Sequence, residues 1–173
     1  KEAANLREEL KKEVSQLKTK YSKVPGLTVI LIGDLTPSQI YVRNKEKSAK
    51  EVGLKSEVIK YPDSVEEITI LKKIDELNRD ETVSGILVQL PLPKQIDERK
   101  VIDAIVVEKD VDGFHAINAG RLSIGGDMLK KAFIPCTPLG SLLLLKDHVE
   151  DLKGKSAVVI GRSNIVGKPM AQL

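Results

Sequence analysis

Short strand-like runs alternate with helical patterns along this sequence, and this alternation restricts the fold more than any other feature. LTVILIG (27–33), LKSEVIKY (54–61) and SGILVQL (84–90) each have the length of a strand in a buried sheet. Strands separated by helices pair in parallel, through right-handed crossovers. The apolar residues are mostly Ile, Leu, Val and Ala, with only 3% aromatics, which suits such packing. The sequence therefore predicts an α/β fold with a parallel sheet.

Local signals predict where several helices begin and end. Helices are expected at residues 2–22, 36–52, 64–78, 96–105 and 139–149. The hydroxyl of Thr36 can cap the second helix, which tolerates a proline in its first turn, and Gly53 predicts its end. Ser64 and Glu67 have the spacing of a capping box at the start of the third helix.

The second half of the chain has a different residue pattern from the first. Residues 108–127 have no periodicity and many turn formers, so we expect a long loop, either functional or disordered. A fourth strand, KSAVVIG (155–161), is expected before the turn RSNIVGKP. The two prolines of PCTP suggest a boundary between an α/β domain at 1–137 and the beginning of a second, truncated one at 138–173. Both ends look cut, so we expect a part of a longer protein.

Composition excludes several classes of partner. The net charge is +3, and its 28 basic residues are mixed with 25 acidic ones, so a nucleic-acid partner is not expected. The longest leucine run, 142–145, is far below the roughly 20 residues that span a bilayer, and no membrane partner is expected. The single cysteine, Cys136, excludes an internal disulfide framework and fits a reducing compartment, which favours the cytoplasm.

The segment YVRNK places Tyr41 and Lys45 four residues apart, on one face of a helix. Tyr41 can pack at the sheet edge while Lys45 extends to water. Alternatively, the ring stacks on a planar ligand and the amine handles protons, which a lysine does well when its pKa is lowered. Gln89 ends a parallel strand, at the edge where such sheets bind ligands. Its amide could accept a hydrogen bond from Lys45, contact a substrate, or only bond to the following turn.

The segment VVIGRSNIVGKP has a strand-to-helix turn of the kind that binds phosphates. Gly161 ends the expected strand, but Ser163 stands where a second glycine would be in the dinucleotide fingerprint. An ordinary strand-to-helix turn therefore stays an equal alternative. The guanidinium of Arg162 could neutralise a 2′-phosphate, which would favour NADP over NAD.

The segment KDVDG places Asp110 and Asp112 in the expected loop. Carboxylates before a glycine often only form turns, and the calcium-loop pattern is incomplete. A buried carboxylate here could instead hold the N–H edge of a heterocycle such as a pterin. His115 and His148 lack partners at ligand spacing, so no metal site is predicted.

Five motifs, in this order, are YVRNK, GILVQLPLP, EKDVDGFHAINAGRL, PCTP and GRSNIVGKP. Together they resemble the bifunctional methylenetetrahydrofolate dehydrogenase/methenyltetrahydrofolate cyclohydrolase family over essentially the whole chain. The resemblance implies two α/β domains, an N-terminal folate-contacting domain and a Rossmann-like NADP domain of which only the beginning is present, with a cleft between them. It also implies a homodimer that works in one-carbon metabolism and purine biosynthesis. Its reaction would oxidise 5,10-methylenetetrahydrofolate with NADP and hydrolyse the product to 10-formyltetrahydrofolate.

The resemblance also implies roles for single residues. Tyr41 matches the aromatic residue that stacks on the aminobenzoyl part of folate, and Lys45 matches the catalytic lysine. Gln89 matches the glutamine that tunes this lysine, and Asp112 the carboxylate that grips the pterin. The cofactor loop corresponds to Gly161, Arg162 and Ser163.

Other functions stay open. The chain could be a monofunctional dehydrogenase of the same family, or a truncated, non-catalytic module that binds folate or dimerises. It could also be an unrelated Rossmann dehydrogenase of the shikimate type. The family is longer at both ends, so further Rossmann strands and a glycine-rich folate contact fall outside these 173 residues.

Overall fold

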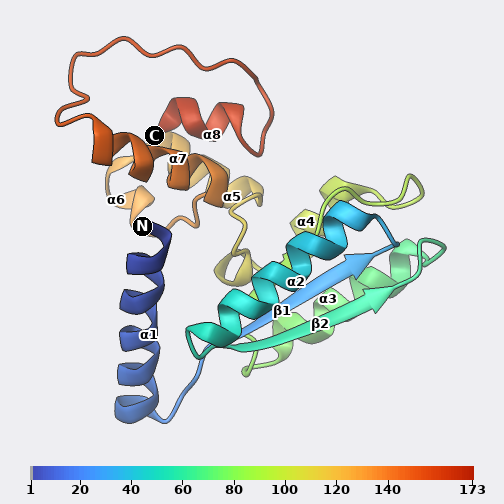
Figure 1. Ribbon diagram of the computed structural model, residues 1–173. Helices are drawn as coiled ribbons and strands as arrows, with labels where there is room; N and C mark the ends of the chain where they lie inside the picture. Colours follow the sequence, from blue (N-terminus) through green and yellow to red (C-terminus); the bar gives the residue numbers. More distant parts are fainter. Residues whose placement is uncertain (1) are drawn as a thin grey trace. The chain divides into compact units, whose positions relative to one another are not determined.

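The computed structural model describes residues 2–173, which form two compact units (Figure 1). The first unit runs to Lys109, and the second covers Asp110–Leu173. Within the described residues, all three strands lie in the first unit, and the regular structure of the second is helical. The α/β fold with a parallel sheet that the sequence predicts is therefore confirmed in the first unit.

The elements of the first unit alternate between helix and strand. They are α1 (Glu2–Tyr21), β1 (Gly26–Ile32), α2 (Thr36–Glu51), β2 (Lys55–Tyr61), α3 (Glu67–Arg79), β3 (Gly85–Val88), α4 (Glu98–Ala104) and the 3-10 helix η1 (Val107–Lys109). The strands are parallel in the order β2-β1-β3, and Ile30 of β1 lies opposite both Ile59 and Val88. The central position of β1 explains its nearly continuous apolar sequence, because both of its faces are covered.

The core lies between one face of this sheet and the helices α3 and α4. Ile30 and Ile86 from the sheet and Ile70 and Ile74 from α3 are fully buried in it. Alternate residues of a strand point to opposite faces, so Leu31 faces the other way and lines a groove beneath α2. Helices on both faces hold the carboxyl ends of the strands in place (Figure 1).

Two of the predicted helix caps do not form, although the helices themselves are present. Helix α2 begins at Thr36, so Leu35 occupies the N-cap position that the sequence assigned to a hydroxyl. Glu67 is the first residue of α3 rather than its third, so the capping box with Ser64 does not form. The Glu67 carboxylate instead accepts a hydrogen bond from the N–H of Asp97 and pairs with Lys100. A tertiary contact with the start of α4 has displaced the local cap.

Helix α2 ends where the sequence predicts. Gly53 has a φ of +88°, and its N–H donates to the carbonyl of Lys50 at 3.1 Å. A side chain is strained in that conformation, so glycine terminates the helix at low cost.

The second unit contains α5 (Ala116–Ile124), α6 (Gly126–Leu129), α7 (Cys136–His148) and α8 (Gly167–Gln172). The long loop predicted at 108–127 is therefore wrong, since α5 lies within it. His115 caps this helix, because its Nδ1 accepts from the N–H of Ile117 at 3.1 Å. Asn118 anchors the first turn in the interior. A buried amide and a histidine cap give no apolar periodicity, and the sequence therefore did not predict this helix.

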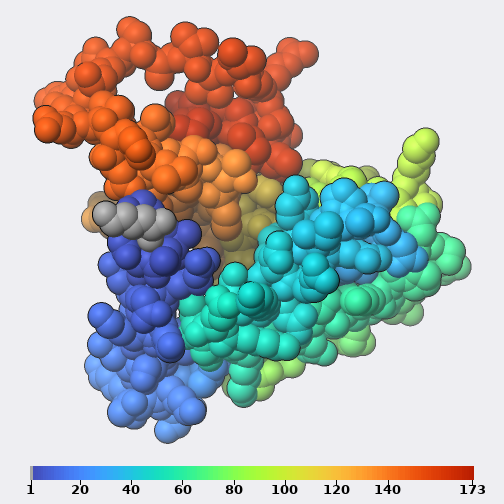
Figure 2. All heavy atoms as spheres, in the orientation of Figure 1, coloured from blue at the N-terminus to red at the C-terminus, as the bar shows by residue number. Residues whose placement is uncertain are grey.

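The strand predicted at 155–161 is also absent from the described residues. Val158 and Ile160 are 89% and 99% exposed. Figure 2 shows this part of the second unit as an orange-red arc with open space beneath it. A strand needs a neighbour to receive its backbone hydrogen bonds, and no other strand occurs among the described residues of this unit. Among residues 2–173, no helix is long and apolar enough to cross a membrane.

Candidate functional site

The first cluster of candidate residues lies where α2 meets the end of β3. The Nζ of Lys45 donates to Oε1 of Gln89 at 3.2 Å. Gln89 directly follows β3, and its backbone N–H donates to the carbonyl of Ile30 at 2.9 Å. Its Nε2 donates to the carbonyl of Leu90 at 2.7 Å. Two contacts to the backbone thus orient the amide so that its oxygen faces the lysine.

Tyr41 lies one turn before Lys45 on α2. Its side chain is 59% exposed, so it does not pack into the sheet edge, as one interpretation of the sequence suggested. Lys45 is partly buried beside it. The arrangement presents an aromatic ring to solvent next to an amine held by an amide. Such a pair can stack on a planar ligand and exchange a proton with it.

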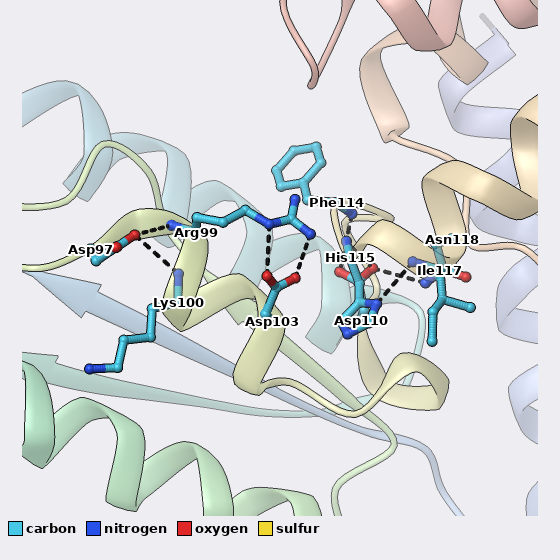
Figure 3. Close-up of polar contacts among 9 residues, drawn as sticks. All are labelled: Asp97, Arg99, Lys100, Asp103, Asp110, Phe114, His115, Ile117 and Asn118. Carbon is cyan, nitrogen blue, oxygen red and sulfur yellow. Dashed lines mark hydrogen bonds and ion pairs between the residues drawn. The ribbon is translucent and has the colours of Figure 1, made fainter.

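The second cluster surrounds Asp112 in the second unit. The carbonyl of Asp110 accepts from the N–H of Gly113 at 3.1 Å, which makes residues 110–113 a turn with Asp112 in its third position. Asp112 is half-buried, whereas the Asp110 carboxylate is buried and accepts three hydrogen bonds (Figure 3). Asp112 is thus the more accessible of the two carboxylates for a ligand.

Gly113 is required in this turn for two reasons. Its φ is +69°, and an added Cβ would lie 2.4 Å from the carbonyl oxygen of Phe133. Any side chain would therefore push residues 110–113 away from Phe133. The turn that carries Asp112 is packed against backbone, which limits how far it can move.

The third cluster is the turn before α8. Gly161 has a φ of +132°, and a Cβ at Gly167 would lie 2.4 Å from its carbonyl oxygen. The Oγ of Ser163 accepts from the N–H groups of Val166 and Gly167 at 3.2 and 3.3 Å. Arg162, between Gly161 and Ser163, is exposed. The turn is closely wound and presents one cation to solvent, although the strand expected before it is not formed.

The histidines act within helices. His115 caps α5, and Nδ1 of His148 lies 2.8 Å from the carbonyl oxygen of Leu144. Cys136 is exposed at the beginning of α7. In the part of the chain that the structure describes, no three His, Cys, Asp or Glu side chains gather as metal ligands do.

The resolved pKa shifts lie outside these three clusters. Hydrogen bonds from Lys100 and from the backbone of Asp97 lower the pKa of Glu67. In turn, the hydrogen bond to Glu67 raises the pKa of Lys100. Glu67 and Lys100 join α3 to α4, so they support the fold that holds β3 rather than the chemistry at its end.

No sequence pattern pointed to Asn118, and Asp110 was a candidate for the carboxylate that holds a heterocycle only on the same terms as Asp112. Asn118 is fully buried and bonded to Asp110, which is itself 2% exposed. The sequence contained a signal: Asp110 and Asp112 are two carboxylates in one short turn, and two such groups are expected to have different roles, one structural and one in binding. Only burial distinguishes them.

Two family descriptions match the chain. The family "Tetrahydrofolate dehydrogenase/cyclohydrolase, catalytic domain" matches residues 1–112, and its "NAD(P)-binding domain" matches residues 135–173.

Similar proteins carry the same assignment. The chain is 64% identical to the bifunctional protein FolD of Pelagibacter ubique, over 99% of this chain and 59% of that protein. It is 54% identical to the FolD protein of Listeria innocua, over 99% of this chain and 58% of that protein. The chain therefore spans somewhat under two thirds of the length of these relatives.

Solved structures resemble this one in fold. The bifunctional FolD enzyme of Campylobacter jejuni superposes with a TM-score of 0.92 at 47% identity, over 98% of this chain and 58% of that one. The FolD of Trypanosoma brucei, solved with NADP cofactor and inhibitor, gives a TM-score of 0.90 at 34% identity, over 98% of this chain and 57% of that one.

Proposed function

This chain belongs to the tetrahydrofolate dehydrogenase/cyclohydrolase family, and we propose that its protein is a bifunctional folate enzyme. It oxidises 5,10-methylenetetrahydrofolate with NADP and hydrolyses the methenyl product to 10-formyltetrahydrofolate. The observation that carries the proposal is the hydrogen bond from Lys45 to Gln89, beside the exposed ring of Tyr41. This is the constellation that the family resemblance requires for the hydrolytic step.

Lys45 moves protons in that step. Water adds to the methenyl carbon, the bond from this carbon to a ring nitrogen breaks, and that nitrogen takes up a proton. The water must lose its protons along the way. One amine can accept a proton from water and later deliver one to the nitrogen. Gln89, fixed by its two backbone contacts, keeps this amine in place between the two transfers.

Tyr41 and Asp112 bind the substrate. The exposed ring of Tyr41 stacks on the planar aminobenzoyl group, since aromatic faces pair in this way. The carboxylate of Asp112 accepts hydrogen bonds from the N–H edge of the pterin. Binding energy from the aminobenzoyl and pterin groups can be used to orient the reacting carbon of the substrate.

Gly161, Arg162 and Ser163 would hold NADP, which supplies the hydride acceptor when bound. The fit rests on the wound turn: Gly167 lies against the carbonyl of Gly161, and Gly161, which is exposed, leaves its own backbone accessible to a phosphate. The exposed guanidinium of Arg162 matches a 2′-phosphate, which a bidentate cation recognises well. The residues present therefore suit NADP better than NAD.

An absorbance experiment tests this function. The full-length protein is mixed with 5,10-methylenetetrahydrofolate and NADP, and the methenyl and NADPH bands are followed. We expect both bands to rise and the methenyl band then to fall faster than in buffer alone. A methenyl band that persists would favour a monofunctional dehydrogenase. Binding of folate without either band would favour a non-catalytic module and refute the proposal.

We also propose a homodimer in the cytoplasm. The family resemblance supports the dimer, and the single cysteine supports a reducing compartment. Sedimentation equilibrium of the full-length protein tests the first statement, and a mass of one chain at all concentrations would contradict it.

A further inference from the structure

We propose that Asp110 is a positioning residue, whose buried carboxylate fixes the turn that presents Asp112 to the pterin end of the substrate. The inference rests on the proposed function for what Asp112 binds. Asp110 acts through Asp112 and touches no substrate itself.

The carboxylate of Asp110 is surrounded by donors. Oδ1 accepts from the N–H of Phe114 at 3.3 Å, and Oδ2 accepts from the N–H of His115 at 2.9 Å and from Nδ2 of Asn118 at 2.8 Å. The residue is 2% exposed. A buried carboxylate is costly unless hydrogen bonds compensate its lost hydration, and here they come from the segment just after Asp112. Figure 3 shows these contacts converging on one side chain.

The backbone of Asp110 also holds the turn. Its carbonyl accepts from the N–H of Gly113, and its carboxylate accepts from the N–H of Phe114. Asp112 therefore lies inside a loop that both bonds of Asp110 close. Asp110 therefore sets the direction in which the side chain of Asp112 points. A simple surface turn would need only the backbone bond.

Asn118 extends the network to a distant segment. It is fully buried, and its Oδ1 accepts from the N–H of Phe133 at 3.2 Å and from Nη1 of Arg121 at 3.4 Å. The carbonyl of Phe133 in turn lies against Gly113. The contacts close a circuit from Asp110 through Asn118 and Phe133 back to Gly113. Such a circuit gives the turn one position rather than several.

The alternative role is stability alone, since the same bonds also order the start of α5. A purely structural residue would lower the melting temperature and affect all substrates together. A positioning residue for Asp112 affects the folate and spares the cofactor. The two Michaelis constants distinguish these roles.

The test is Asp110→Asn in the full-length protein. The amide keeps the shape, but one oxygen becomes an NH₂ group that faces donors. We expect the KM for 5,10-methylenetetrahydrofolate to rise about tenfold, because bonds to a charged acceptor are strong ones. The KM for NADP should stay within about twofold, a change below the effect of one such bond. Asp127→Asn is the matched control, because that carboxylate is 90% exposed and pairs with Lys130, three residues further along the chain; it should change neither constant.

A double-mutant cycle with Asp112→Asn completes the test. If Asp110 acts through Asp112, adding Asp110→Asn to that variant should raise the folate KM by less than about twofold. Fully additive effects, an unchanged folate KM, or equal rises in both constants would overturn the proposal. Should Asp110→Asn fail to fold, Asn118→Ser removes one donor to the same carboxylate and must give the folate-selective rise. A wild-type protein that turns over no folate would refute the proposed function itself, whereas normal turnover with an unaffected Asp110→Asn would refute only this inference.

Discussion

At the scale of single residues, the contact between Lys45 and Gln89 joins side chains that are 44 positions apart. The sequence made this contact predictable, because a helix after one parallel strand and the end of a neighbouring strand meet at the same edge of the sheet. The exposure of Tyr41 was not predictable, because its position on the helix suits both packing at the sheet edge and stacking on a ligand. Burial also separated the two carboxylates of KDVDG, which the sequence could not.

Lys45→Met should abolish hydrolysis of the methenyl compound, with a loss of about 100-fold or more, because general acid–base catalysis contributes that much. The decay of the methenyl absorbance measures it. Lys47→Met is the control, because Lys47 is an exposed lysine on α2 that pairs with Glu51. Unchanged hydrolysis in Lys45→Met would refute the role given to this amine.

Arg162→Ala should weaken NADP much more than NAD. Loss of a charge-assisted contact to the 2′-phosphate costs about 1.5–3 kcal/mol, or roughly 10-fold or more in affinity, and NAD lacks that phosphate. Titration of the full-length protein with each dinucleotide measures the two affinities. Equal losses would remove the argument for NADP preference.

At the scale of elements, α3 and α4 show how tertiary contacts override local signals. Glu67 has the sequence context of a capping-box member, yet its carboxylate bonds to the start of α4. These bonds depend on the packing of two helices over one sheet, so no window of local sequence contains them. The helix itself was predictable, and the partner of its first charged residue was not.

The bond to α4 gives the stability of the first unit a pH dependence. Hydrogen bonds hold the pKa of Glu67 below its ordinary value of 4.5, so its contribution is complete above that pH. It is lost as the pH falls through the lowered pKa. The melting temperature of Glu67→Gln should therefore lie below that of wild type at pH 7, and the gap should narrow at about pH 3.

Thermal unfolding at several pH values measures this gap. Glu66→Gln, at the preceding position, is the control for removing any carboxylate from this turn. A gap between wild type and Glu67→Gln that widens on acidification would contradict the prediction.

At the scale of the whole molecule, the two units differ in how they are built. The first buries a contiguous core against its sheet, whereas the second is held by short helices and by the polar contacts around Asp110. The domain boundary near residue 137 stays a prediction: the compact units divide between 109 and 110, and the family descriptions leave residues 113–134 between their matches.

This difference predicts two unfolding steps for the 173-residue chain. Ile86→Ala removes a fully buried side chain and should cost the first unit about 2–5 kcal/mol. Ile160→Ala, at a 99% exposed position, should change stability by less than about 0.5 kcal/mol. Urea unfolding followed by hydrogen exchange measures both units at once. A single transition, or a large effect of Ile160→Ala, would contradict the prediction.

The sequence by itself determined the elements that depend on local pattern. Alternating strands and helices specify a parallel sheet, Gly53 ends a helix because its backbone conformation excludes side chains, and a four-residue spacing places Tyr41 and Lys45 on one face. Only the tertiary structure decided the features that depend on distant partners. Residues 155–161 have strand propensity but no strand beside them among the described residues, and α5 forms around a buried asparagine that no periodicity marks. The physical reason is the same in each case: backbone and buried polar groups take the structure in which their hydrogen bonds are satisfied, and those partners come from elsewhere in the chain.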